Sequence, residues 1–414
     1  KVWSEEKKAY LSACIEVNGH QRQLFFLPKP VAGESEPDMG ALYQEISELL
    51  SNKVIPRGTQ GEKFKCKAVT RKYAFEYDGI PRNKEGTKYM KVLYNSKFPT
   101  LDLETVRGKH FSHIFGTKTK IIENFIVKRK LMGPCWIDIR DPLPGKNTSW
   151  AKLEGRVDDP KLISVTKEKI DPPPLNVMSI SMKTYLNSKN HNHEIAMISA
   201  ITHQDVLCHK PTPNEMDRRQ ISNFSLVRAI HSGLEGGVGT FPPGFTTFVT
   251  RNKGMNLKTL PNERAMLNIF MNKIQAADPD IIVGHAIKDH DLDVMMHRMA
   301  ALKVNQWSKL GRLKLSKVPR AYQRGANSGM KNFQRVSPGR LIVDTYHCSK
   351  DVLQLKSSNF KLNTLAKKYL KIEKPPESIY AQDVPRYYST KDNLMYLKKH
   401  TENFAYMALG LMFR

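Results

Sequence analysis

The sequence predicts two mixed domains, an amino-terminal α+β domain followed by an α/β domain with a partly parallel, mixed sheet. Three observations support this fold class. Residues 1–172 alternate short strand-like runs with a few helical patterns, whereas residues 261–346 alternate helix and strand. The triple proline at 172–174 is a stiff break, because each proline fixes its own φ and restricts the residue before it. At 414 residues the chain also exceeds the usual size of one hydrophobic core, so we expect domains 1–172 and 173–414.

The amino-terminal domain combines strands with two helices. The predicted elements, in order, are a strand pair at 14–18 and 22–27, a helix at 38–53, strands at 63–77 and 88–94, a helix around 121–126 and a strand around 136. Leu42, Ile46 and Leu50 lie on one face of the first helix, and Asp38 is placed to cap it. We expect Cys135 and Trp136 to be packed in a core.

The second domain opens with the strand NVMSISMKTY at 176–185 and pairs it with a second apolar strand at 194–200 as a hairpin. Alternation puts three apolar residues on one face and a largely polar set on the other, which predicts a half-buried strand. The two faces comprise Met178, Ile180 and Met182, and Val177, Ser179, Ser181 and Lys183. The later elements are a helix at 261–277, a short apolar strand within 278–285, a helix at 289–302, a strand at 341–346 and helices at 360–370 and 391–412.

The composition indicates a polyanionic partner. Lys and Arg number 66 against 40 Asp and Glu, which gives a net charge of +26. Nucleic acid is favoured over an anionic membrane surface, because the basic residues are interspersed with globular patterns and no apolar run could span a bilayer. The five cysteines show no zinc spacing, which favours a reduced intracellular compartment. His191 and His193 could ligate a metal, but two histidines in a polar turn are more often solvated.

One segment, residues 301–340, contains ten basic residues and no acidic ones. Such a run is usually a solvated face, yet its length favours phosphate contact. The nucleic-acid-binding candidates are Lys309, Arg312, Lys314, Lys317, Arg320, Arg324, Lys331 and Arg335.

The strand at 176–185 has the scaffold of a two-metal phosphodiesterase without its carboxylates. Acidic residues at 181 and 183 would project together from the sheet and, with two more from later helices, could neutralise two dications. In this chain those two positions hold Ser181 and Lys183. An ammonium where a dication should bind opposes metal binding by several kcal/mol, on the order given by Coulomb's law at intermediate dielectric.

Three motifs resemble those of the 3′–5′ exonuclease domain of family B DNA polymerases, which implies a ribonuclease H-like, DnaQ-like fold. SISMK at 179–183 is similar to the S-F-D-I-E motif, and ADPDIIVGHAIKDHD at 277–291 is similar to DPDIIxGYNIxxFD. HTENF at 400–404 stands where Y-x-x-x-D is expected. On this resemblance the degenerate exonuclease positions are Ser181, Lys183, Ala286, Asp291, His400 and Phe404. Only Asp291 keeps a carboxylate, and capping or flanking a helix is its favoured role.

The wider resemblance is to the alpha branch of family B, which does not proofread, and it extends to FSHIFGTKTK at 111–120 and WSKLGRLKLSKVP at 307–319. It implies a nuclear polymerase that extends RNA primers. Implied partners are DNA, RNA–DNA primer–template, primase subunits and an accessory B subunit, with no membrane. No palm motif occurs in the chain, so we expect an inactive portion without metal or other cofactor, and Mg in a polymerase domain downstream. Both ends are expected to be cuts.

Two rival hypotheses stay open at this point. One is an active but divergent 3′–5′ exonuclease that takes replacement carboxylates from Asp289, Asp293 or Asp344. Asp344 lies in an apolar strand, where a hydrogen-bonded structural role is favoured. The other is a binding module for nucleic acid that acts independently of polymerisation and rests on the basic segment. For Lys183, contact with a phosphate and pairing with Asp291 are both open.

Overall fold

The computed structural model divides into two compact units, which are described separately here. It describes residues 1–31, 36–55, 64–73, 80, 83–101, 108–187, 191–208, 221–230, 239–319 and 335–414. The amino-terminal unit comprises 15–145 and 155–170, and the carboxy-terminal unit comprises 1–14, 146–154 and 171–414. The units therefore differ from the expected division at residue 172 in one respect: two short early segments belong to the carboxy-terminal unit.

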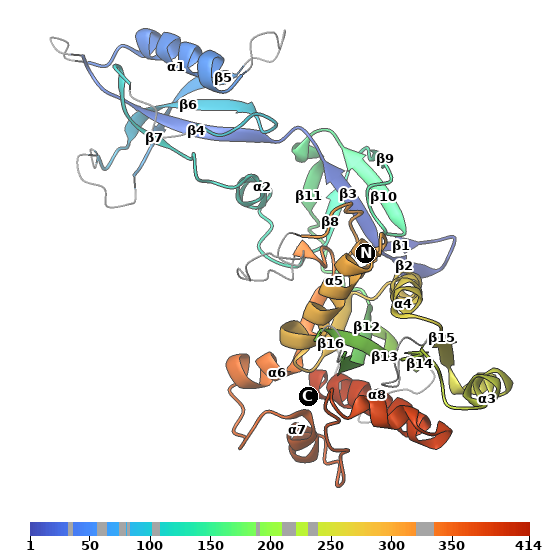
Figure 1. Ribbon diagram of the computed structural model, residues 1–414. Helices are drawn as coiled ribbons and strands as arrows, with labels where there is room; N and C mark the ends of the chain where they lie inside the picture. Colours follow the sequence, from blue (N-terminus) through green and yellow to red (C-terminus); the bar gives the residue numbers. More distant parts are fainter. Residues whose placement is uncertain are drawn as a thin grey trace. The chain divides into compact units, whose positions relative to one another are not determined.

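The amino-terminal unit contains an antiparallel four-stranded sheet in the order β5–β6–β4–β7, with α1 packed against it (Figure 1). The elements are β4 (Gln21–Pro28), α1 (Met39–Lys53), β5 (Lys65–Arg71), β6 (Thr87–Asn95) and β7 (Phe111–Phe115). The predicted helix and its cap are confirmed, because the Asp38 carboxylate accepts the backbone N–H groups of Gly40 and Ala41. Leu42, Ile46 and Leu50 are fully buried, which anchors α1 in this core.

The remaining elements of this region are short strands and one helix, namely β3 (Ala13–Val17), α2 (Ile121–Arg129), β8 (Ile137–Ile139), β9 (Leu143–Pro144), β10 (Leu153–Val157), η2 (Pro160–Leu162) and β11 (Ile163–Val165). The predicted pairing of 14–18 with 22–27 is wrong, because β3 lies beside β10 while β4 pairs with β6 and β7. Cys135 is exposed, not packed in a core as expected.

The carboxy-terminal unit is built on a six-stranded mixed sheet in the order β15–β14–β13–β12–β16–β17. Its strands are β12 (Leu175–Leu186), β13 (His193–Val206), β14 (Ile221–Arg228), β15 (Leu257–Leu260), β16 (Ile281–Gly284) and β17 (Leu341–Asp344). The predicted hairpin is β12–β13, and β16 and β17 add to β12 in parallel. The α/β class with a partly parallel sheet is therefore confirmed. A separate small hairpin pairs β1 (Val2–Ser4) with β2 (Ala9–Leu11).

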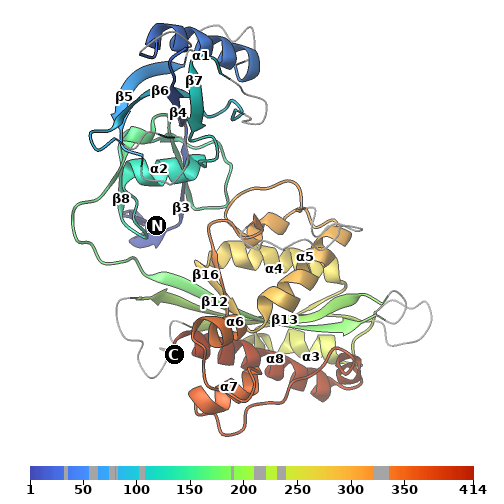
Figure 2. The same cartoon turned by 90° about the vertical axis from the view of Figure 1, so that its left-hand side faces the viewer.

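Helices cover both faces of this sheet, as Figure 2 shows for α4 and α5 on one side and α8 on the other. The helical elements are α3 (Phe245–Arg251), η4 (Lys253–Met255), α4 (Glu263–Ala277), η5 (Ile287–Asp291), α5 (Leu292–Ala301), η6 (Trp307–Leu310), α6 (Thr345–His347), η9 (Cys348–Val352), α7 (Leu362–Tyr369), η10 (Val384–Tyr388) and α8 (Lys391–Met412). Met178 and Ile180 face α4 and α5, while Val177 packs against α8. Strand β12 is thus buried on both faces, and the prediction of a half-buried strand is wrong.

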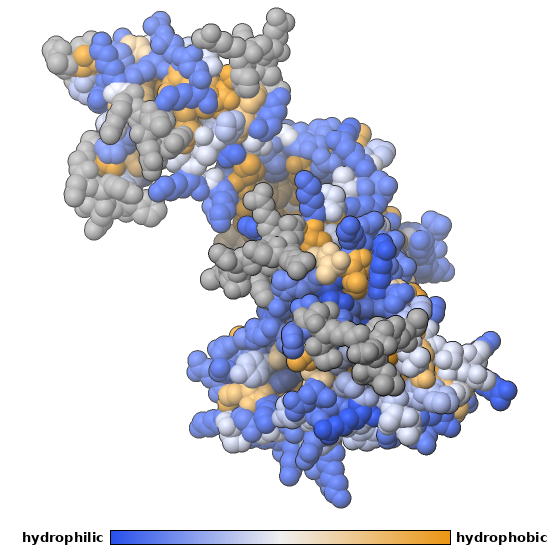
Figure 3. All heavy atoms as spheres, viewed as in Figure 1, coloured by the Kyte–Doolittle hydropathy of each residue, from blue (hydrophilic) through white to orange (hydrophobic). Residues whose placement is uncertain are grey.

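The surface is mostly polar on the face shown in Figure 3, where hydrophilic side chains cover much of each unit and apolar ones are scattered between them. No helix within the described ranges has the length and apolar character needed to cross a membrane.

Candidate functional site

The polar face of β12 lies directly under α8. The Ser179 hydroxyl donates a hydrogen bond of 2.7 Å to the backbone carbonyl of Ala405, which holds the middle of the strand against the helix. Ser181 is two residues further along the same face and is partly buried. Because side chains of a strand alternate between faces, Lys183 follows on this side. Two of the expected exonuclease positions therefore face one helix.

Lys183 is a buried cation that lies against an aromatic ring. Its side chain is only 7% exposed, and the ammonium lies 4.5 Å from the centroid of the Phe404 ring. No carboxylate oxygen in the described part of the chain is within 4.0 Å of this ammonium. Burial lowers the pKa of Lys183 to about 8, and the charge of Asp291 opposes that change. Pairing with Asp291 is thus electrostatic, without a direct ion pair.

Asp291 closes η5, the short π-helix that leads into α5. Asp291 directly precedes α5, as expected for a residue that flanks a helix, but its side chain makes no capping hydrogen bond to α5. Although the residue keeps some exposure, its carboxyl is enclosed, and burial raises the pKa of Asp291 to about 7. Lys183 opposes this rise in pKa, and the negative charge of Asp344 adds to it.

Asp344 holds the turn that positions Asp291. Its two carboxylate oxygens accept the backbone N–H groups of Ala286 and Lys288, each at 2.9 Å. Ala286 has a left-handed φ of 55°, which an alanine adopts only when its surroundings impose it. Asp344 is 1% exposed, so the hydrogen bonds satisfy a buried carboxylate. The geometry is that of the structural role favoured for this residue.

His400 and Phe404 lie one turn apart on α8 and stack with ring centroids 4.4 Å apart. Burial, with a further contribution from the charge of Lys183, lowers the pKa of His400 to about 4, so the imidazole is neutral near pH 7. Its Nε2 donates to the backbone carbonyl of Glu377 at 2.6 Å. The Nδ1 atom is buried without a hydrogen-bond partner in the described region. The histidine and the phenylalanine thus form an aromatic wall beside Lys183.

The resemblance implies that these positions share one site, and their chemistry here is that of a cation held against two aromatic rings. The members of this cluster, the Lys183 cluster, are Ser181, Lys183, Asp291, His400 and Phe404. Within the ranges that the structure describes, no group of three or more His, Cys, Asp or Glu side chains is placed to hold a metal ion. A dication here would meet the ammonium at short range, where each pair of unit charges repels by about 4 kcal/mol at 4 Å.

His193 lies near a histidine from a distant part of the chain. The rings of His193 and His290 are 5.4 Å apart, and His290 Nε2 is 3.3 Å from the Thr184 hydroxyl. Burial and the neighbouring His193 lower the pKa of His290. This pair would supply two nitrogen ligands, whereas structural metal sites use four. His191 has a left-handed φ of 51° in the turn after β12.

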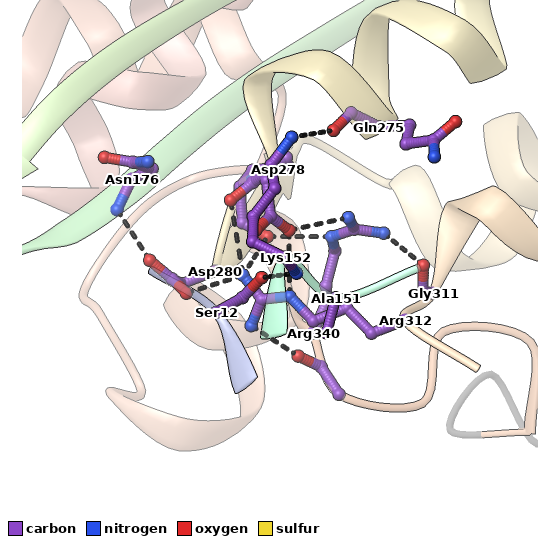
Figure 4. A network of polar contacts seen from close by, with 12 residues as sticks. Ser12, Ala151, Lys152, Asn176, Gln275, Asp278, Asp280, Gly311, Arg312 and Arg340 are labelled. Carbon is purple, nitrogen blue, oxygen red and sulfur yellow. Dashed lines mark hydrogen bonds and ion pairs between the residues drawn. The ribbon is translucent and has the colours of Figure 1, made fainter. Parts of the chain in front are cut away.

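The first part of the basic segment is folded into an internal network (Figure 4). Arg312 is paired with Asp278 at 2.9 Å and with Asp280 at 2.7 Å. The Lys309 ammonium donates to the side-chain oxygens of Asn272 and Gln306, each at 2.7 Å. Both cations therefore have internal partners, which differs from the phosphate contact expected for them.

Arg340 is the centre of this network, and its side chain is fully buried. Its guanidinium pairs with Asp278 at 3.0 Å and donates to backbone carbonyls, including those of Pro279 and Lys309. Burial lowers the pKa of Arg340 to about 10, while Asp278 opposes that change. The DPD sequence at 278–280 is similar to part of an exonuclease motif, and sequence reasoning missed its contacts to these arginines. The two arginines are more than 30 residues from the two aspartates in the sequence, so no local pattern predicts that they pair.

The rest of the candidate nucleic-acid-binding set divides into two parts. Lys317 and Arg335 are exposed, and the Lys314 ammonium lies 4.8 Å from the ring centroid of Trp150 beside the Asn147 side chain. The other three candidates, Arg320, Arg324 and Lys331, lie outside the described residues.

Comparison with known proteins gives one family and a consistent set of relatives. Residues 112–365 match the model of the DNA polymerase family B exonuclease domain. The chain is 34% identical to the DNA polymerase alpha catalytic subunit of Xenopus laevis, 33% to that of Mus musculus and 33% to that of Oryza sativa subsp. japonica. These similarities cover 100%, 100% and 99% of this chain. The chain spans about a quarter of the relatives' length, namely 27%, 27% and 28%.

Proposed function

The chain belongs to the family B DNA polymerases, in the part that carries their exonuclease domain, and from this premise we propose a non-nucleolytic role for it. The whole protein is proposed to be the catalytic subunit of a nuclear DNA polymerase alpha, which extends RNA primers with deoxynucleotides. This portion serves as scaffold and nucleic-acid contact. Its partners are DNA and RNA–DNA primer–template, and primase and an accessory subunit bind the whole protein. Any Mg required for polymerisation is proposed to bind outside this portion.

One observation carries the proposal that the exonuclease site is inactive. The ammonium of Lys183 lies against the ring of Phe404, at two positions where the family motifs have carboxylates. Two-metal hydrolysis needs close carboxylates to neutralise its dications and to activate water. A buried lysine and a phenylalanine supply neither function. Asp291 would then be the only one of the four motif carboxylates left to bind a metal. Burial raises the pKa of Asp291 to about 7, which opposes the ionised form that a metal needs.

The replacement carboxylates that an active enzyme would need have other partners. Asp344 accepts backbone N–H groups, as described above, and Asp289 is bound by His347 at 2.7 Å. Asp293 is paired with His297 at 3.5 Å. These contacts support the inactive site over the divergent exonuclease.

A nuclease assay with a gain-of-function control tests this proposal. The wild-type chain is incubated with Mn²⁺ or Mg²⁺ and a 5′-labelled single-stranded oligonucleotide, and we expect no shortening from the 3′ end. The matched control is the triple variant Ser181→Asp/Lys183→Glu/Phe404→Asp, which restores four carboxylates with Asp291. We expect this variant to bind Mn²⁺ by calorimetry while the wild type does not. Shortening by the wild type that is lost in Asp291→Ala would refute the proposal.

The nucleic-acid-binding part of the proposal rests on the net charge of +26 and on the exposed cations Lys317 and Arg335, with Lys314 at the edge. Phosphate contacts release counterions, so each lost contact on a duplex reduces the slope of log K against log salt by about 0.9. Neutralising all three to Gln should therefore reduce the slope by about 2 to 3, measured with a labelled primer–template. An unchanged slope would show that these three side chains do not contact phosphates and are ordinary solvated surface charges.

A further inference from the structure

The amino-terminal unit contains a cavity of about 290 Å³ that the exonuclease-like site does not involve. It lies between α2, the turn after β3 and the segment that contains η2. Its lining residues are Gly19, His20, Gln21, Lys65, Ile121, Asn124, Phe125, Lys128, Arg129, Asp158, Asp159, Pro160 and Lys161. The volume is at the lower end of the range for small-molecule sites, which admits one nucleotide but excludes a duplex.

Four cations line this cavity without acidic partners. No ion pair shorter than 4.0 Å involves Lys65, Lys128, Arg129 or Lys161 anywhere in the described ranges. Burial, together with Lys91 and Arg129, lowers the pKa of Lys128, as expected where like charges are held close. Such a cluster is stabilised when an anion enters it.

The two carboxylates at the cavity are already used by the fold. Asp158 accepts the side-chain amide of Asn18 at 3.0 Å, and Asp159 accepts the backbone N–H of Lys161 at 2.8 Å as the cap of η2. Their charges reduce the positive potential but leave four cations against two anions. The cavity therefore keeps a net positive lining.

The shape of the cavity is fixed by its backbone and by an aromatic pair. Gly19 has a φ of +72°, and a Cβ there would lie 2.3 Å from the carbonyl oxygen of Asp158. No other residue allows that close approach of the two segments. The rings of His20 and Phe125 meet edge to face at 5.2 Å. Burial, with a contribution from Lys128, lowers the pKa of His20, so this pair is an uncharged aromatic surface near pH 7.

We propose that this cavity binds one nucleotide of a single-stranded nucleic acid, with its phosphate at Lys65, Lys128, Arg129 and Lys161 and its base beside Phe125. A cationic groove with an aromatic side chain is the usual arrangement for single strands, since phosphates and base faces are common to every sequence. That the ligand is a nucleic acid rests on the proposed function. The location of the binding site rests on the cavity. It does not depend on the Lys183 cluster.

The experiment measures binding of a fluorescein-labelled dT12 strand by anisotropy, over a range of salt concentrations. The test variant is Lys128→Gln/Arg129→Gln, and the matched control is Lys84→Gln/Lys88→Gln, which removes two exposed cations of the same unit outside the cavity. We expect the test variant to bind about tenfold more weakly at low salt and to lower the salt slope by about 1.4, from 0.7 per contact. The control should stay within twofold. Phe125→Leu should weaken binding without changing the slope.

The outcomes separate the inference from the proposed function. If the wild type binds dT12 and both double variants weaken it equally, or neither does, the cavity is not the site and only this inference fails. If the wild type does not bind dT12 at all, this inference fails; the nucleic-acid-binding function fails as well only if the wild type also does not bind the labelled primer–template. Free dTMP is expected to compete only weakly; competition as strong as that of dT12 would make a free nucleotide the ligand and overturn the assignment to a strand. Circular dichroism confirms that each variant is folded.

Discussion

Replacing Lys183 with methionine should stabilise the carboxy-terminal unit near pH 7. Burial lowers the pKa of Lys183 from its ordinary 10.5 to about 8, a change of roughly 2.5 units. At about 1.36 kcal/mol per unit, the buried ammonium costs on the order of 3 kcal/mol in the free energy of unfolding. Methionine has a similar length and no charge, so it fills the same space between β12 and the ring of Phe404.

Two smaller effects reduce this gain. The attraction between the ammonium and the aromatic ring is lost, which is worth about 0.5–2 kcal/mol, although a thioether contact with Phe404 recovers part of it. Asp291 loses its opposing charge, so its pKa rises above 7 and its carboxyl becomes protonated. A neutral buried carboxyl costs little more than the partly ionised one. Subtracting these losses from the roughly 3 kcal/mol penalty of the ammonium gives an expected net stabilisation of about 1–2 kcal/mol for Lys183→Met.

The measurement is urea unfolding followed by hydrogen exchange of β12 and α8, which reports on this unit alone. The sign of the pH dependence is fixed by the depressed pKa. Below about pH 8 the folded protein carries the full penalty of the ammonium. Between pH 8 and 10.5 the unfolded chain binds the proton that the folded protein has released, so wild-type stability rises with pH. The advantage of the variant should therefore shrink by about 2 kcal/mol between pH 8 and 9.5.

The matched control is Lys398→Met, on α8. Lys398 is 9% exposed, close to the 7% of Lys183, but it has a carboxylate partner in Glu402 at 2.7 Å. Removing one member of such a pair leaves the other unpaired, so this variant should be destabilised by about 1–3 kcal/mol. The reasoning would be refuted if Lys183→Met unfolded more easily than the wild type at pH 7 and if the loss of stability were the same at high pH. Such a result would mean that the ammonium supports the fold.

Two further predictions concern ion pairs of the same unit. Arg340→Met should destabilise it by about 2–4 kcal/mol in urea unfolding, because Asp278 would keep only Arg312 and the buried carbonyls of Pro279 and Lys309 would lose their donor. Arg340→Lys, which keeps the charge, should lose less, and equal loss would contradict this account. Hydrogen bonds to Asp351 and Asp289 raise the pKa of His347. The protonated imidazole therefore stabilises η5 and η9 fully below pH 6.5, and this stabilisation is lost as the pH rises through the pKa of His347 in the folded protein. Exchange protection of η5 and η9 should fall in that window for the wild type and stay level in His347→Gln; a fall in both would show another titrating group.

The helices with strong periodicity were predictable from the sequence. The last helix has the predicted bounds of 391–412, and the helix at 39–53 has its predicted cap and buried face. Both follow from local rules, namely apolar spacing and a capping side chain before the first turn. The order of strands in a sheet depends on distant segments, which is why the partner of β3 was misassigned.

The site was predictable in its positions and less so in its contacts. The resemblance to the exonuclease motifs implies that residues 181, 183, 291, 400 and 404 share one region, and the structure brings Lys183, Asp291, His400 and Phe404 together. The burial of both faces of β12 was missed, because α8 covers the second face from more than 200 residues away. The internal role of Arg312 was missed for the same reason, since a run of basic residues gives no sign of which ones meet aspartates.

The contact of Lys183 with Phe404 also bears on how easily such a chain could regain a nuclease. Lys183→Glu alone would add a second enclosed carboxylate beside Asp291, whose own ionisation is already opposed by its surroundings. Phe404→Asp alone would give the ammonium an anionic partner and hold it more firmly in place. Neither single step rebuilds a two-metal site, because Lys183→Glu leaves no carboxylate at 181 or 404 and Phe404→Asp keeps the ammonium. Recovery of the site therefore needs several changes together, and the cation stacked on Phe404 opposes a dication until it is replaced.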